Sequence, residues 1–233
     1  MLEIIPAVMP LSYRDIEQKI EKIIESVRTI QLDLMDGKYV SAKTWPFNDF
    51  SGSNWQNILN EEHGMPSWES VDYELDLMIE DVPKYFTDLV RIGPTRIIFH
   101  FPKNKDKKEE LKKFILNLDN FYKYEIQLGI AYEHGDDLQD ILDIGQEIKF
   151  VQCMGIDQIG IQGAHFDETV FERIEKIKET LPDVEITIDG SVNTHTIKRL
   201  HDAGAIRFVV GSAIFNNEYP SIAVNELYDL ISN

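Results

Sequence analysis

Cysteine is almost absent from the chain, since Cys153 is the only one among 233 residues. A disulfide within the chain is therefore impossible, which suits a reducing compartment. No apolar run approaches the roughly 18 residues that a membrane span needs. The N-terminus lacks both the basic start and the apolar length of a signal peptide. We therefore expect a soluble, cytoplasmic protein that has no membrane partner.

Positive charge is also scarce. The chain has 23 Lys and Arg residues against 41 Asp and Glu residues, which gives a net charge of −18. Nucleic acids and anionic membranes bind to basic patches, so this balance argues against either as the main partner. A small phosphorylated metabolite is still compatible with an acidic chain, because backbone N–H groups and helix N-termini can supply a local positive end.

Strand-like and helix-like runs alternate along the whole chain. Strands are expected over 3–8, 29–35, 73–79, 96–101, 125–132, 148–154, 184–189 and 206–211. Helices are expected over 12–27, 53–61, 81–92, 105–119, 136–144, 167–181, 194–203 and 220–231. This α/β alternation predicts a single-domain (β/α)8 TIM barrel over residues 1–233. A doubly wound open sheet is the alternative, but "PAVMPLS" follows the first strand where a glycine-rich dinucleotide loop would be expected.

Two pentapeptides, "QLDLM" and "ELDLM", each place an aspartate inside an apolar strand. Because side chains alternate between the two faces of a strand, the leucines suit the helix layer, and Asp33 and Asp76 should point into the barrel. Asp189, at the end of "EITID", is expected to point the same way. An aspartate at a strand end is also often a turn or cap residue, an interpretation that fits Asp36 and Asp157 better.

Three inward carboxylates are costly to bury without a metal, a cationic partner or a function that uses raised pKa values. Two carboxylates across a pocket can remove a proton next to a carbonyl and return one to the opposite face of the enediolate. The second and seventh strands of an eight-stranded barrel lie across the lumen from each other. Asp33 and Asp189 therefore fit the acid/base pair of an epimerase.

Small residues follow the last two strands, in "DGSVN" (189–193) and "GSAIF" (211–215). They would let backbone N–H groups approach an anion, as in the common phosphate site of such barrels, although they could also simply form tight turns. Gly160 and Gly163, in "IGIQGAHF" after the sixth strand, could belong to a lid over the same ligand.

At these positions the chain resembles the ribulose-phosphate 3-epimerase family. The resemblance covers nearly the whole chain and is most specific in "LDLMDGKYV", "LDLMIEDVPKYF", "IIFHFP", "IDGSVN" and "AGAIRFVVGSAIF". It implies that Asp33 and Asp189 are the catalytic pair. The phosphate contacts that it implies are Gly190, Ser191, Gly211 and Ser212. It also implies that Met35, Met78, Met154 and His100 contact the substrate, and we expect the lid glycines Gly160 and Gly163 to do so as well.

The departures from the family fall in its metal site, which holds a divalent cation with two aspartates and two histidines. Gln31 and Asp76 stand where the histidines would be, so the candidate ligands are Gln31, Asp33, Asp76 and Asp189. An oxygen-only set favours Mg²⁺, Mn²⁺ or Ca²⁺ over zinc. The alternative is that no metal binds. Ala7 also replaces a serine that contacts substrate in the family.

The leading hypothesis is epimerisation of ribulose 5-phosphate and xylulose 5-phosphate, or of a related hexulose phosphate. A sugar-phosphate lyase of the related barrels is less favoured, because "DLMDGK" has Leu and Met where the D-x-K-x-x-D pattern needs Lys and Asp. A non-catalytic sugar-phosphate binding protein is the third hypothesis, and retention of both catalytic aspartates argues against it.

The resemblance also implies a homo-oligomer. The Trp-rich segment 45–68 is expected at a subunit interface or at the barrel mouth.

Overall fold

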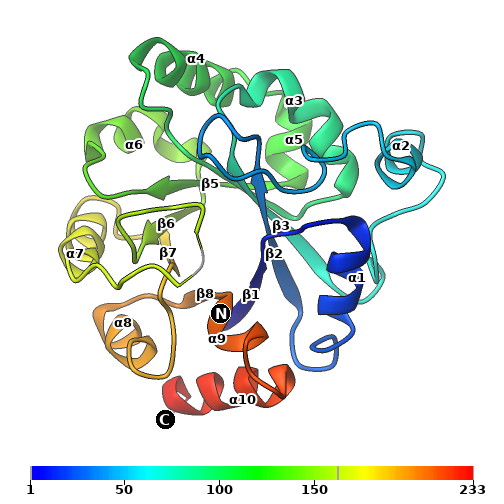
Figure 1. Ribbon diagram of the computed structural model, residues 1–233. Coiled ribbons are helices and arrows are strands. Elements are labelled where there is room, and N and C mark those ends of the chain that lie inside the picture. The colour runs from blue at the N-terminus through cyan, green and yellow to red at the C-terminus, as the bar shows by residue number, and fades with distance from the viewer. Residues whose placement is uncertain (1, 162, 233) are drawn as a thin grey trace.

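Eight parallel strands close into a barrel in the order of the sequence, and helices surround it (Figure 1). The computed structural model describes residues 2–161 and 163–232. The strands are β1 (Glu3–Val8), β2 (Thr29–Met35), β3 (Asp72–Met78), β4 (Arg96–Phe99), β5 (Gln127–Tyr132), β6 (Phe150–Met154), β7 (Glu185–Asp189) and β8 (Arg207–Val210). The predicted (β/α)8 TIM barrel is confirmed.

Ten α-helices lie in the described part of the chain. They are α1 (Tyr13–Ile20), α2 (Ser53–Leu59), α3 (Val82–Leu89), α4 (Lys105–Leu116), α5 (Asn120–Glu125), α6 (Leu138–Ile144), α7 (Val170–Thr180), α8 (Ile197–Ala203), α9 (Ser212–Phe215) and α10 (Pro220–Ile231). None of these helices is long and apolar enough to cross a membrane. Most elements fall within a few residues of the ranges expected from the sequence.

Two helices end earlier than expected, and two short helices, α5 and α9, were not expected. The helix expected over 12–27 ends at Ile20, because the chain then tightens into turns such as Ile23 N–H to the carbonyl of Ile20. The helix expected over 105–119 ends at Leu116. Asp119 then accepts a hydrogen bond from Phe121 N–H and caps the separate helix α5, which delays the start of β5. The one-turn helix α9 was not expected.

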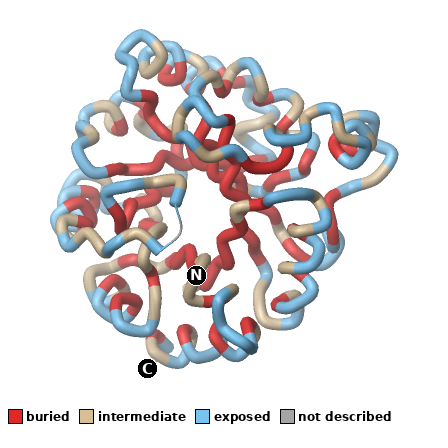
Figure 2. Tube along the Cα trace, viewed as in Figure 1, coloured by how far each residue is buried: buried red, intermediate tan, exposed pale blue. Residues whose placement is uncertain are grey.

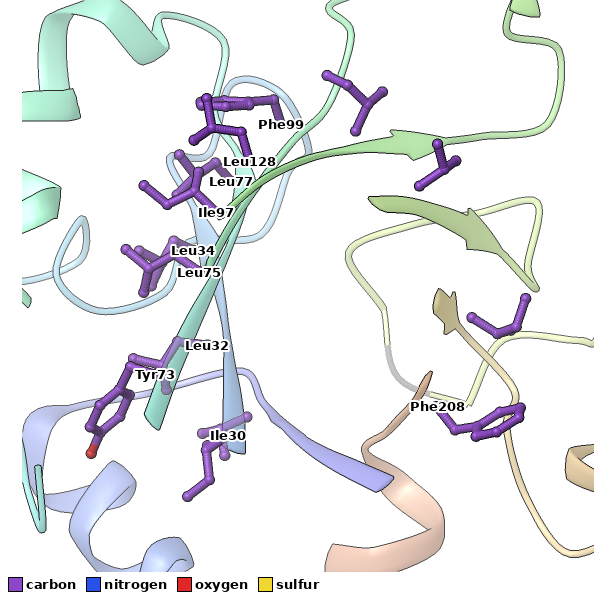
Figure 3. Packing of buried hydrophobic residues seen from close by; sticks show 14 of the residues in the cluster. Ile30, Leu32, Leu34, Tyr73, Leu75, Leu77, Ile97, Phe99, Leu128 and Phe208 are labelled. Atoms are coloured by element: carbon purple, nitrogen blue, oxygen red, sulfur yellow. The ribbon is translucent and has the colours of Figure 1, made fainter. Parts of the chain in front are cut away.

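Strand register separates the two faces of the repeated pentapeptides. Leu32 pairs with Leu75 and Leu34 pairs with Leu77, and all four side chains are buried against the helix layer. Figure 3 shows these leucines on one side of β2 and β3. Figure 2 shows that the strands at the centre of the molecule are buried and that the exposed residues lie on the outer surface. The alternate residues of these strands therefore face the lumen.

The Trp-rich segment packs largely against the barrel itself. Trp45 and Trp55 are buried and meet edge to face, with ring centroids 5.5 Å apart. The backbone N–H of Trp45 donates to the carbonyl of Pro10, which ties the segment to the chain just after β1. Trp68 is exposed. Two of the three tryptophans therefore stabilise the fold of this chain.

A buried ion pair closes the N-terminal end of the lumen. The Arg207 guanidinium donates to Glu74 at 2.7 Å and to Glu3 at 3.0 Å, and Arg207 and Glu74 are 1% and 0% exposed. Burial raises the pKa of Glu74, while the Arg207 charge opposes that rise. The second oxygen of Glu74, Oε1, is buried and has no hydrogen-bond partner within the described residues.

The first and last strands form the seam of the barrel. β1 pairs with β8 in parallel, from Glu3 with Arg207 to Pro6 with Val210. The final helix, α10, covers this seam, where the Tyr228 hydroxyl accepts a hydrogen bond from Ile4 N–H. The barrel is therefore closed by elements from the two ends of the chain.

Candidate active site

A cavity of about 320 Å³ opens at the C-terminal ends of the strands. Its walls contain twelve of the fourteen site residues predicted from the sequence. These are Asp33, Met35, Asp76, Met78, Met154, Gly160, Gly163, Asp189, Gly190, Ser191, Gly211 and Ser212. The remaining two, Gln31 and His100, are fully buried next to the aspartates and do not line the cavity.

The three aspartates come together as strand alternation predicted. Asp33 of β2 lies beside Asp76 of β3 in the parallel register, and Asp189 reaches them from β7. One oxygen from each of the three lies within 4.8 Å of the others. Asp76 is fully buried and Asp33 is only 9% exposed.

Two glutamine amides fix the aspartates. Gln31 Nε2 donates to Asp33 Oδ1 at 3.0 Å and to Asp189 Oδ2 at 2.9 Å. Gln152 Nε2, from β6, donates to the same Asp189 oxygen at 3.2 Å. Sequence reasoning missed Gln152, although a glutamine inside the apolar strand "FVQCM" was the signal that could have identified it.

His100 connects the aspartates to a second acidic group. Its Nε2 lies 2.6 Å from Asp76 Oδ1, and its Nδ1 lies 2.8 Å from Glu133 Oε1. Burial alone would lower the pKa of His100, but the two carboxylates raise it to about 10. Both ring nitrogens therefore donate, and the imidazole is charged. His100, predicted as a substrate contact, lies behind Asp76 and away from the cavity wall.

Glu133, which sequence reasoning also missed, is the partner that holds His100 in place. It accepts hydrogen bonds from the Tyr39 hydroxyl and from Lys103 Nζ as well as from His100. Burial would raise the pKa of Glu133, but these donors lower it to about 2. The available signal was an acidic residue directly after the apolar run "QLGIAY".

The carboxyl groups of Asp33 and Asp189, the pair predicted to be catalytic, are hard to ionise. Burial raises the pKa of Asp33 well above its ordinary value, and the nearby Asp189 and Asp76 raise it further. Burial and Asp76 raise the pKa of Asp189 to about 7, although the Gln31 hydrogen bond opposes this shift. Two acids of this kind can share a proton near neutral pH.

The acidic triad could hold a divalent cation. Asp76 Oδ2, Gln31 Oε1 and Gln152 Oε1 are buried without a hydrogen-bond partner in the described part of the chain. Oxygen atoms of this type are the ligands that hard cations prefer. The donor set therefore fits a hard divalent cation better than it fits zinc.

The glycines of the cavity wall have conformational and steric reasons to be glycine. Gly190 has φ +100°, and a Cβ there would lie 2.7 Å from the Ile156 side chain. Gly160 has φ +79°, and a Cβ there would lie 2.9 Å from the Val40 side chain. The Ser191 hydroxyl donates to the carbonyl of Ala164, so the segment after β7 is linked to the segment after β6. Both segments line the same cavity.

Asp36 has the structural role expected of it. Its Oδ1 accepts from the N–H groups of Lys38 and Tyr39, and its Oδ2 accepts from the N–H of Glu80. It therefore shapes the turn after β2 and ties that turn to the chain after β3.

The profile of the Ribulose-phosphate 3 epimerase family matches residues 3–215. The chain belongs to this family. The ribulose-phosphate 3-epimerase of Helicobacter pylori is 23% identical to it over 98% of both chains. The one from Schizosaccharomyces pombe is 20% identical over 97% of this chain and 92% of the relative. The family resemblance inferred from the motifs is therefore confirmed.

Solved structures share the fold of this family member at low sequence identity. A 3-hexulose-6-phosphate synthase superposes with a TM-score of 0.68 at 18% identity and covers 99% of this chain and 100% of its own. KGPDC from Streptococcus mutans, in complex with a phosphorylated sugar, gives a TM-score of 0.68 at 12% identity and covers 99% and 97%. At these identities the likeness shows the barrel fold.

Proposed function

We propose that the protein is a ketose-phosphate 3-epimerase that transfers protons at the carbon next to the carbonyl through an enediolate. As a member of its family, the protein is an enzyme of carbohydrate-phosphate metabolism. The observation that carries the proposal is the pairing of Asp33 and Asp189 at one cavity. These residues come from β2 and β7, which are separated around the closed barrel by β1 and β8.

Each aspartate of the pair keeps one oxygen for the substrate. Gln31 binds Asp33 Oδ1 and Asp189 Oδ2, and the described residues make no hydrogen bond to Asp33 Oδ2 or Asp189 Oδ1. One carboxylate acts as the base that takes the substrate proton, and the other, protonated, returns a proton to the opposite face. The raised pKa values of both groups support one proton being shared between them near neutral pH.

The remaining cavity wall suits a phosphorylated sugar. We assign the phosphate to the backbone around Gly190, Ser191, Gly211 and Ser212. The first N–H groups of a helix have no acceptor within that helix, and α9 begins at Ser212. The KGPDC structure with the same fold is described in complex with a phosphorylated sugar, which supports this class of ligand. Met35, Met78 and Met154 supply an apolar wall for the planar intermediate.

A divalent cation, when bound, would be held by Asp33, Asp76 and Asp189, and Gln31 Oε1 would become a further oxygen ligand only if its amide released Asp33 and Asp189. It would supply positive charge to the oxygens of the enediolate. The oxygen-only set favours Mg²⁺ or Mn²⁺ over zinc.

We place the enzyme in the cytoplasm, and the homo-oligomer implied by the family resemblance stays a prediction.

Hydrogen exchange tests the proposal directly. The protein is incubated in D₂O with pentulose and hexulose phosphates, with and without Mg²⁺ or Mn²⁺, and the carbon next to the carbonyl is followed by NMR. Asp33→Asn and Asp189→Asn should abolish deuterium incorporation while phosphate esters still raise the melting temperature. Asp157→Asn, at an exposed aspartate after β6, is the matched control.

Exchange with one sugar would identify the substrate. A thermal shift with phosphate esters but no exchange with any sugar would favour a binding protein. Cleavage of the sugar in place of exchange would favour a lyase. Either of the last two results would contradict the epimerase.

A further inference from the structure

We propose that Gln31 assembles the catalytic pair without a metal, because its amide bridges Asp33 and Asp189 in the place that a bridging cation would take. The catalytic meaning of this bridge rests on the proposed function, whereas its effect on cation binding does not. Gln31 acts here as a positioning residue.

The bridge follows from the geometry of a single nitrogen atom. Gln31 Nε2 carries two hydrogens and lies 3.0 Å from Asp33 Oδ1 and 2.9 Å from Asp189 Oδ2, both normal hydrogen-bond distances. One hydrogen therefore reaches a carboxylate on β2 and the other reaches a carboxylate on β7. A divalent cation links two carboxylates in the same manner, by attracting one oxygen of each.

The orientation of this amide is determined by its surroundings. Turning the amide over would place Oε1 against Asp33 Oδ1 and Asp189 Oδ2, and with one proton shared between the two acids at least one of these oxygens would repel it. The backbone of Gln31 is held in β2, in register with Ala7 of β1 and Glu74 of β3, and the residue is fully buried. Gln31 Oε1 has no partner in the part of the chain described. The two hydrogen bonds donated by Nε2 therefore determine the orientation of the Gln31 amide.

Protein donors reach every member of the acidic triad. Asp33 accepts from Gln31, Asp189 accepts from Gln31 and Gln152, and Asp76 lies 2.6 Å from His100. Hydrogen bonds to ionised carboxylates are among the stronger ones in proteins. The cluster is therefore stabilised by the protein's own side chains, with no need for an external cation.

A cation must compete with this arrangement. If Gln31 is to become a ligand, its amide must rotate and release both carboxylates before Oε1 can face the metal. Metal binding then breaks two hydrogen bonds for the one ligand that Gln31 provides. We therefore expect the wild-type protein to bind divalent cations weakly, and to gain affinity when residue 31 can act only as a ligand.

Four proteins test the inference: wild type, Gln31→Leu, Gln31→His and Gln152→Leu. Gln152→Leu is the matched control, because Gln152 is an equally buried glutamine that donates to Asp189 alone among the three aspartates. The measurements are metal content after purification without chelator, Mn²⁺ binding by calorimetry, melting temperature with EDTA or Mn²⁺, and kcat and KM for exchange.

The wild type should contain no stoichiometric metal, and EDTA should change neither its melting temperature nor its exchange rate. Gln31→His should bind Mn²⁺ roughly tenfold or more tightly than wild type, the scale on which changes around metal sites act. Gln31→Leu should lose roughly tenfold or more in kcat with little change in KM, and Mn²⁺ should restore part of that loss. Gln152→Leu should show no rescue by Mn²⁺.

Stoichiometric metal in the wild type, with EDTA lowering its melting temperature, would overturn the inference, because Gln31 would then be a ligand. An unchanged kcat in Gln31→Leu, or Mn²⁺ rescue of Gln152→Leu, would also overturn it. If wild type shows no exchange with any sugar, the proposed function fails. The calorimetry and melting temperatures of Gln31→His still decide whether residue 31 controls cation binding.

Discussion

Replacing Arg207 with methionine would remove the cation from a buried ion pair and leave Glu74 behind. Arg207 Nη2 lies 2.7 Å from Glu74 Oε2, and both residues are almost completely buried. Removing one partner of such a pair typically costs about 3–5 kcal/mol, because the remaining charge has no compensation. A domain is typically stable by about 5–15 kcal/mol, so this loss is a large fraction of the total.

The cost should depend on pH in a defined direction. Burial already raises the pKa of Glu74, and removing Arg207 removes the main group that opposes this rise. An acid with a raised folded-state pKa contributes stability below its unfolded-state pKa of 4.5, and this contribution is lost as pH rises through the folded value. The deficit of Arg207→Met should therefore be smaller at pH 5 than at pH 8.

Urea unfolding followed by circular dichroism measures this deficit, and two controls accompany it. Arg28→Met removes an exposed partner of Asp72 and should cost less than about 1 kcal/mol. The double variant Arg207→Met/Glu74→Gln should recover part of the loss, because residue 74 then carries no charge. A deficit below about 1 kcal/mol for Arg207→Met at pH 8, or one that grows on acidification, would refute the reasoning.

Because Asp76 and Glu133 raise the pKa of His100 from 6.5 to about 10, its charge stabilises the fold fully below pH 6.5, and this contribution is lost as pH rises through 10. As pH rises from 6.5 to about 10, the melting temperature of wild type should fall, and that of His100→Gln should change less. The pKa of Asp189 is raised to about 7, so its ionisation destabilises the fold as pH rises. Urea unfolding should show that Asp189→Asn gains stability at pH 8 relative to pH 5 by about 1–3 kcal/mol, and equal gains would contradict this. Gly190→Ala should lose about 1–3 kcal/mol from its positive φ and the clash with Ile156. Gly135→Ala, at φ +83° in open space, should lose less in the same assay.

Periodicity predicted the barrel and the inward direction of the aspartates, because both depend on local rules. Alternation along "QLDLM" assigns Leu32 and Asp33 to opposite faces whatever the neighbouring strands are. The register then brings Asp33 next to Asp76, which are 43 positions apart in the sequence and share one inward face.

Side-chain contacts between residues far apart in the sequence could not be predicted in this way. Gln152 and Glu133 each lie in or beside an apolar strand, and their partners, Asp189 and His100, come from other strands. The Arg207–Glu74 pair joins residues 133 positions apart across the lumen. Such pairs depend on side-chain reach inside the closed barrel, for which a single sequence carries no periodic signal.

The seam between β1 and β8 has a consequence for how the protein is made. During translation β1 is made before the other strands, and its edge has no β8 to pair with until β8 has been synthesised. An unpaired strand edge can pair with other chains. A chain that still lacks β8 therefore leaves the β1 edge open to such pairing, and the addition of β8 removes that exposed edge.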